Sequence, residues 1–426
     1  MKTSVSDGNL VMVYRFASSA CNATASYVGQ GTLFASILVA SLYFSYPVGL
    51  FALTVKDSDG DATNGALWKM KYALWCFWCV LGNGGFTLVL YILPAYAAWW
   101  LLLFRVLQGM AQAVVSTGAS MISYMTSYNV RSFHLAYMFG LSLDGGIALG
   151  VLISGLLVTA ASDVYLSNGT PLYLVLPTAF VTVAAGVVGV VIALAWPTEI
   201  RVVPDEYRFA PEAPSSMLED DSTSDLTKRK IRICAIYLVG LLRTTIKVSW
   251  LTICLTILED VYDLTLLGAC ELYSAIILVS VGASQIAAFN YPLFKDSVWM
   301  RASDMALVLA SVLFFASAKL TEKGLGGLGT FATASALYYA STLVSFNVMF
   351  TMLAKYNIKG DPTWGPNAVI LINTLLTVMV GRISGPIVGE YCYFHLGSDE
   401  HPAAGYGAFL VAGTVLTVIL SVILLQ

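Results

Sequence analysis

The chain has 426 residues, of which 58% are hydrophobic and 11% are charged, whereas about 25% of the residues of a typical soluble domain are charged. With a mean hydropathy of +0.77 and a net charge of −3, the composition excludes a soluble enzyme, a nucleic-acid-binding protein and a disordered protein. The sequence predicts an all-α, multi-pass membrane protein.

Membrane-spanning helices need about 20 mostly apolar residues each. We find eleven such stretches: 31–55, 72–93, 97–124, 133–160, 172–197, 232–257, 264–290, 302–319, 328–354, 366–394 and 404–425. Most of the connections between them are short. The exception is 198–231, which is polar and contains three prolines. This stretch cannot bury enough apolar surface to fold, so we expect a flexible linker on the cytoplasmic side.

A weak internal repeat supports a division of the chain at this linker. Tyr46-Pro47 returns as Tyr291-Pro292, and Gly146-x3-Gly150 returns as Gly381-x3-Gly385, in both cases after about 240 residues. The alternative is coincidence in a glycine-rich apolar chain. The repeat predicts four segments: a partial first helix and outer loop (1–30), an N-terminal bundle (31–197), the linker (198–231) and a C-terminal bundle (232–426). The counterpart of 232–257 would begin before Met1, so we expect a truncated first helix, with a signal peptide as the alternative.

The distribution of Lys and Arg predicts the orientation in the membrane. If 31–55 runs from outside to inside, 14 basic residues lie on the inner side and 4 on the outer side, as cytoplasmic loops require. Two glycosylation sequons, at Asn22 and Asn168, also fall on the outer side. We therefore expect a glycoprotein of the plasma membrane or of a lysosome- or vacuole-like organelle.

Three motifs resemble those of the major facilitator superfamily. Arg105-x2-Gln108-Gly109 is similar to the signature of its fourth helix, and the two glycine motifs, at Gly146 and Gly381, are similar to those of its fifth and eleventh helices. The resemblance extends from residue 31 onward and implies a two-bundle fold with about 11 complete transmembrane helices. The pattern is most similar to the lysosomal and vacuolar branches. The family's charged loop motif after the second helix is missing, because Leu53 stands where that motif has Asp.

Ionisable residues inside the spans are the candidates for function, because a charge in the membrane is costly unless it faces a cavity or a partner. The substrate-binding or coupling set is Arg105, Gln108, Asp144, Arg243, Lys247, Glu271 and Arg382. In the functional interpretation the cations attract an anionic solute, and Asp144 or Glu271 relays protons. In the structural interpretation Lys247 pairs with Glu271, and Arg105 with Asp144, only to neutralise charge.

We therefore expect a secondary-active or facilitative transporter that moves a small solute by alternating access, is coupled to protons if it is coupled at all, and acts as a monomer. The sequence contains no pattern of metal ligands and no phosphate-binding loop, so no metal or cofactor is expected. Two alternatives stay open. One is a membrane-embedded, lipid-modifying enzyme, although no cluster of carboxylates or histidines is visible at one interface. The other is a non-transporting, receptor-like protein with the same fold.

Overall fold

The computed structural model describes 65–92, 97–111, 144–167, 172–197, 223–323, 326–356, 375–396 and 402–425, with isolated residues between these ranges. Every predicted span from 72 onward overlaps a helix, whereas 31–55 lies outside the described residues. The helices of the first half are α5 (Gly65–Ile92), α6 (Ala97–Ala111), α9 (Gly145–Ala160) and α10 (Leu172–Ala195). Those of the second half are α12 (Thr223–Asp260), α13 (Leu266–Asn290), α14 (Asp296–Glu322), α15 (Leu328–Tyr356), α17 (Arg382–Phe394) and α18 (Pro402–Leu425).

Seven of the described helices are long and apolar enough to cross a membrane, and α9 is a shorter apolar helix. The all-α membrane architecture is thus confirmed, while the total of eleven spans stays a prediction. One boundary differs from the expectation, because α12 begins at Thr223, inside the stretch that the sequence assigned to the linker. The apolar helix continues without a break into its polar N-terminal turns.

Local sequence explains where several helices end. Asp263, at φ 53°, turns the chain between α12 and α13, and Asp is among the residues that tolerate this left-handed conformation. The side chain of Thr265 then accepts a hydrogen bond from the Gly268 amide and caps α13. Between α13 and α14, Pro292 lies in the short helix η3 (Tyr291–Leu293). The connections from α12 to α13 and from α13 to α14 are therefore short.

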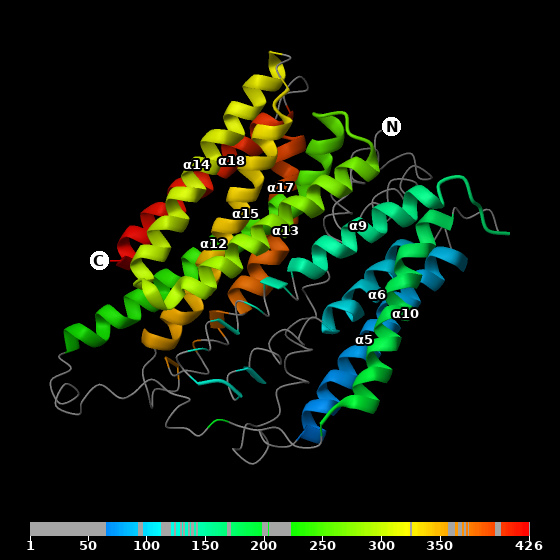
Figure 1. Ribbon diagram of the computed structural model, residues 1–426, viewed down its shortest axis with the longest axis horizontal. Coiled ribbons are helices and arrows are strands. Elements are labelled where there is room, and N and C mark those ends of the chain that lie inside the picture. The colour runs from blue at the N-terminus through cyan, green and yellow to red at the C-terminus, as the bar shows by residue number, and fades with distance from the viewer. Residues whose placement is uncertain are drawn as a thin grey trace.

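The packing of the helices repeats between the two halves. In the first half α5 packs against α6 and α10, and in the second half α14 packs against α15 and α18. Figure 1 shows α5, α6 and α10 as one group, and α12 with the later helices as another. Helix α9 lies at the boundary, because it packs against α10 and against α13. Its residues Ala148 and Val151 belong to the same apolar core cluster as buried residues of α12, α13 and α15.

Candidate functional site

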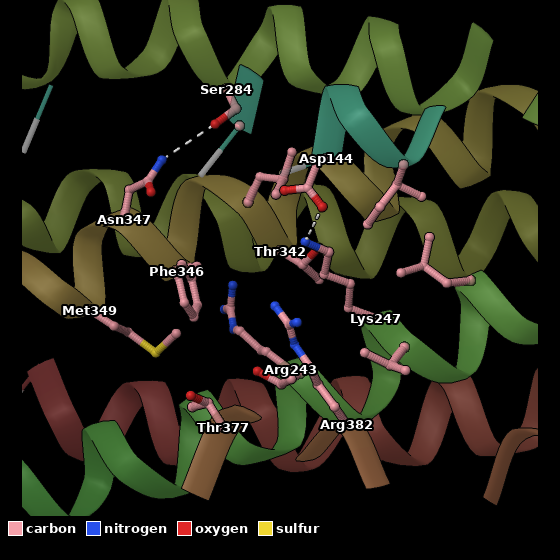
Figure 2. A pocket seen from close by; sticks show the side chains of 16 residues that line it. Asp144, Arg243, Lys247, Ser284, Thr342, Phe346, Asn347, Met349, Thr377 and Arg382 are labelled. Carbon is pink, nitrogen blue, oxygen red and sulfur yellow. Dashed lines mark hydrogen bonds and ion pairs between the residues drawn. The ribbon is translucent and has the colours of Figure 1, made fainter. Parts of the chain in front are cut away.

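A cavity lies at the boundary between the two groups of helices (Figure 2). The space inside it that is open to water-sized molecules measures about 60 Å³, enough for a few waters at roughly 10–15 Å³ each. Segments before and after the linker both contribute to its wall. The lining residues include Gly140, Asp144, Ile147, Arg243, Thr244, Lys247, Ser284, Thr342, Phe346, Asn347, Met349, Thr377 and Arg382.

One ion pair in the wall joins the two halves of the chain. The ammonium group of Lys247, on α12, donates to Asp144 Oδ1 at 2.7 Å, and Asp144 lies directly before α9. The hydroxyl of Tyr339 donates to the same oxygen at 2.5 Å. Lys247 Nζ also lies 4.8 Å from the centre of the Tyr339 ring, within the range of a cation–π contact. Three helical segments therefore meet at one carboxylate.

A second ion pair lies within the second half of the chain. Arg243, one helical turn before Lys247, forms an ion pair with Asp304 on α14. Its guanidinium also donates to the hydroxyl of Ser303 at 3.0 Å, and Ser421 on α18 donates to Asp304 at 3.3 Å. The Nε atom of Arg243 is buried and has no hydrogen-bond partner among the described residues. Residues of α14 thus fix the guanidinium group of Arg243, and its side chain forms part of the cavity wall.

The glycine motif of α17 positions the third cation, Arg382. A Cβ atom added at Gly385 would lie 2.8 Å from the Cβ of Val248 on α12, and one at Gly381 would lie 3.0 Å from that of Thr244. The absence of side chains at these positions therefore lets α17 approach α12 closely. The turn before Arg382 is π-helical, over Leu375–Gly381, a feature that is frequent at functional sites. Figure 2 shows Arg382 and Arg243 pointing into the same space.

Helices α9 and α13 pack closely against each other beside the cavity. Ser274 donates to the backbone oxygen of Ala148 at 2.8 Å, and a Cβ atom at Gly155 would lie 2.8 Å from the Cβ of Cys270. Beside this seam, the ring of Trp250 stacks on that of Tyr273, with centroids 5.5 Å apart. Among the described residues, this seam between α9 and α13 is therefore tightly packed.

Two of the predicted cavity residues lie elsewhere. Arg105 is buried between α5 and α6, where it donates to Gln108 at 2.7 Å, and Gln108 donates to Asn83 at 3.1 Å. Neither Arg105 nor Gln108 lines the cavity. The expected pairing of Arg105 with Asp144 is wrong, because Asp144 faces Lys247 and Tyr339. Among the contacts of the described residues, the fourth-helix signature connects α6 with Asn83 of α5.

The expectation for Glu271 also fails. Its side chain is exposed and absent from the cavity wall, and Lys247 pairs with Asp144 instead. The depth estimate placed Glu271 within about one turn of Lys247, but the rotation of α13 points Tyr273 and Ser274 inward. The sequons at Asn22 and Asn168 lie outside the described residues.

Sequence reasoning missed two residues that hold the site together, Asp304 and Tyr339. Asp304 was overlooked because the predicted span began at 302, which put this acid at the membrane boundary. The helix begins at Asp296, so Asp304 lies about two turns inside it. Tyr339 gave no signal, since a tyrosine in an apolar span is usually a packing residue. Among the described residues, no group of three or more potential ligands could hold a metal ion.

Comparisons with known proteins agree with this architecture. No family model and no curated protein matches the sequence. Among solved structures, the human organic anion transporter MFSD10 (TETRAN) is similar with a TM-score of 0.62 and 14% identity over 98% of this chain and 95% of that one. The transporter FucP, in its outward conformation, is similar with a TM-score of 0.57 and 14% identity over 98% and 96% of the two chains. The chain thus has the fold of the major facilitator superfamily transporters, as an integral, multi-pass membrane protein.

Proposed function

We propose that this protein moves a small organic anion across its membrane by alternating access, and that the cavity of Figure 2 is the solute site. The observation that carries this proposal is the Asp144–Lys247 ion pair, which joins the two halves of the chain at the wall of the cavity. A contact of this kind can break and re-form as the halves rock against each other.

The contacts also suggest which side is closed, if the orientation predicted from Lys and Arg holds. In that orientation α9 and α12 run outward, and α13 runs inward. The seam residues Gly155 and Cys270 then lie on the outer side of Asp144, whereas Ser284, Asn347 and most of the cavity lie on its inner side. We infer that the seam between α9 and α13 closes the outer side of the protein, and that the solute site is open toward the inner side of the membrane.

The charges in the wall favour an anionic solute. Among the described lining residues, Asp144 is the only acid, against the three cations Arg243, Lys247 and Arg382. The unpaired Nε of Arg243 can donate to a carboxylate or phosphate oxygen. Phe346 and Met349 add an apolar surface. The organic anion transporter among the similar structures is consistent with this chemistry.

Proton coupling, if it occurs, is assigned to Asp144. A solute anion that approaches Lys247 competes with the carboxylate for the same ammonium group. We prefer Asp144 to Glu271 for this role, because the side chain of Glu271 is exposed and outside the cavity wall.

Several finer expectations remain proposals. They are the division into bundles at 31–197 and 232–426, glycosylation at Asn22 and Asn168, the monomeric state and the lysosomal or vacuolar resemblance. Treatment of the protein from eukaryotic cells with glycosidase tests the sequons, because removal of a glycan increases mobility on a gel.

The decisive experiment is uptake into proteoliposomes, read by mass spectrometry over a panel of organic anions, cations and neutral solutes. We expect accumulation of one or more anions, reduced at least tenfold by Arg382→Gln. The exposed Lys323, at the other end of the second half, provides the control variant Lys323→Gln, which should transport normally. Uptake no greater than in empty liposomes for every solute would overturn the proposal. Normal anion uptake by Arg382→Gln would overturn the assigned anion site.

A further inference from the structure

Helix α12 is longer than the membrane is thick. Its 38 residues, at about 1.5 Å each, extend over roughly 57 Å, whereas the hydrocarbon core measures about 30 Å. The buried apolar part begins at Ile233. The turns before it contain Lys228, Arg229, Lys230 and Arg232, so a cluster of cations lies where the helix leaves the membrane.

Two aromatic residues mark the same level. Lys230 Nζ lies 5.9 Å from the centre of the Trp364 ring, and Arg232 Cζ lies 5.3 Å from that of Tyr356. Trp and Tyr are enriched at the headgroup level of membranes, where one end of the ring is apolar and the other is wet. The cations of α12 therefore contact aromatic residues of the kind that gather at the headgroup level.

The start of α14 adds further cations and exposed apolar surface at this end. Lys295 and Arg301 are both exposed, and Leu293 and Phe294, directly before α14, are 72% and 54% exposed. Met300 belongs to the same apolar cluster as Ile233 of α12, so the two helices begin at the same end of the bundle. We call this set of cations the basic collar: Lys228, Arg229, Lys230, Arg232, Lys295 and Arg301.

We propose that the basic collar binds the headgroup of an anionic phospholipid, whose acyl chains lie against the exposed apolar side chains beside it. Clusters of Lys and Arg at the membrane boundary attract anionic lipids, and basic pockets between helices hold their headgroups. Asp296, in the first turn of α14, accepts a hydrogen bond from Tyr291. The proposal rests on the membrane fold and not on transport, so the two can fail separately.

The test measures thermal unfolding of the purified full-length protein in detergent, with short-chain phosphatidylserine, phosphatidylcholine or glycerophosphoserine added. Lys228→Gln/Arg229→Gln removes two charges from the collar and leaves the contacts with Trp364 and Tyr356 in place. The matched control, Lys319→Gln/Lys323→Gln, removes two exposed charges at the opposite end of α14. We expect phosphatidylserine to raise the unfolding temperature of the wild type and the control, and the collar variant to lose at least half of that shift.

Three outcomes would overturn the proposal. An equal shift with phosphatidylcholine would mean that the acyl chains alone bind. An equal shift with glycerophosphoserine, which lacks chains, would indicate an anion site that does not need a lipid. The third outcome is that phosphatidylserine leaves the unfolding temperature of the wild type unchanged, while the collar variant is less stable than the wild type even without lipid. Another part of the chain, such as the acidic run at Glu219, would then occupy the collar. In 1 M salt, where the Debye length is about 3 Å, the expected shift should largely vanish.

Discussion

The seam between α9 and α13 predicts that a single methyl group can bias the conformation of this protein. A Cβ atom at Gly155 would lie 2.8 Å from the Cβ and 2.9 Å from the Sγ of Cys270, whereas carbon atoms pack best at about 3.5–4.0 Å. Gly155→Ala must therefore push the helices apart by roughly 1 Å. Overpacking of this kind costs about 1–3 kcal/mol. If the seam opens during transport, the same energy shifts the population toward the open state by about 5- to 150-fold.

The assay follows Cys270, which is 1% exposed in the closed seam. Proteoliposomes are treated with a membrane-impermeant maleimide, and mass spectrometry measures labelling of this cysteine. The control is Gly282→Ala, on α13, where an added Cβ meets nothing within 4 Å among the described residues. Both variants gain the helix propensity of Ala, about 0.5–1 kcal/mol, so their difference isolates the contact at the seam.

We expect Cys270 to be labelled several times faster in Gly155→Ala than in Gly282→Ala, and from the outside. Equal labelling rates in the two variants would refute the reasoning, because the seam would then either tolerate the methyl group or never open. Faster labelling only from the inside would refute the assigned orientation.

Three further predictions concern the buried ion pairs. Asp144→Asn should abolish any pH dependence of uptake and, because it removes one partner of a buried pair, should lower the free energy of unfolding by about 3–5 kcal/mol. The double variant Asp144→Asn/Lys247→Met should recover part of this stability in thermal unfolding. Additive losses from the two substitutions would contradict the pairing. Arg243→Gln and Asp304→Asn should each destabilise the protein by a similar amount, with the double variant less destabilised than the sum, as a double-mutant cycle would measure. Tyr339→Phe keeps the ring beside Lys247 and removes the hydrogen bond to Asp144, so the free energy of unfolding should fall by about 1.5–3 kcal/mol; an unchanged unfolding temperature would show that the bond contributes nothing.

Much of the fold could be predicted because the membrane imposes a length on every apolar run. The spans from 72 onward were found in this way. The glycine motif at Gly381 was noted as a resemblance, and the structure adds that Gly381 and Gly385 pack closely against α12. The predicted start of α12 was too late in the sequence, because the length rule applies only to apolar residues. Its first turns are polar, and hydropathy carries no information about a helix that continues into water.

The site was harder to predict, because sequence gives the depth of a charge but not the direction in which its helix faces. By depth, Lys247 was expected to pair with Glu271, whereas in the structure it pairs with Asp144. Only the rotation of α13, which is apolar on nearly all sides, decides against Glu271. In a membrane a polar stripe need not face outward, so the usual signal for helix rotation is missing. Asp304 was not recognised as a site residue, because the predicted span placed it at the membrane boundary.

The ion pair between the halves has a consequence for the synthesis of this protein. Asp144 and Lys247 are 103 residues apart, which ribosomes at about 5–20 residues per second need roughly 5–20 s to cover. During that interval the carboxylate is already in the membrane without its counter-ion, at an insertion cost of about 2.5–3.5 kcal/mol. The nascent first half is therefore an electrostatically incomplete intermediate, which a chaperone or quality-control protease can recognise. Expressed alone it should be degraded quickly, and co-expression of the second half, which supplies Lys247, should extend its lifetime.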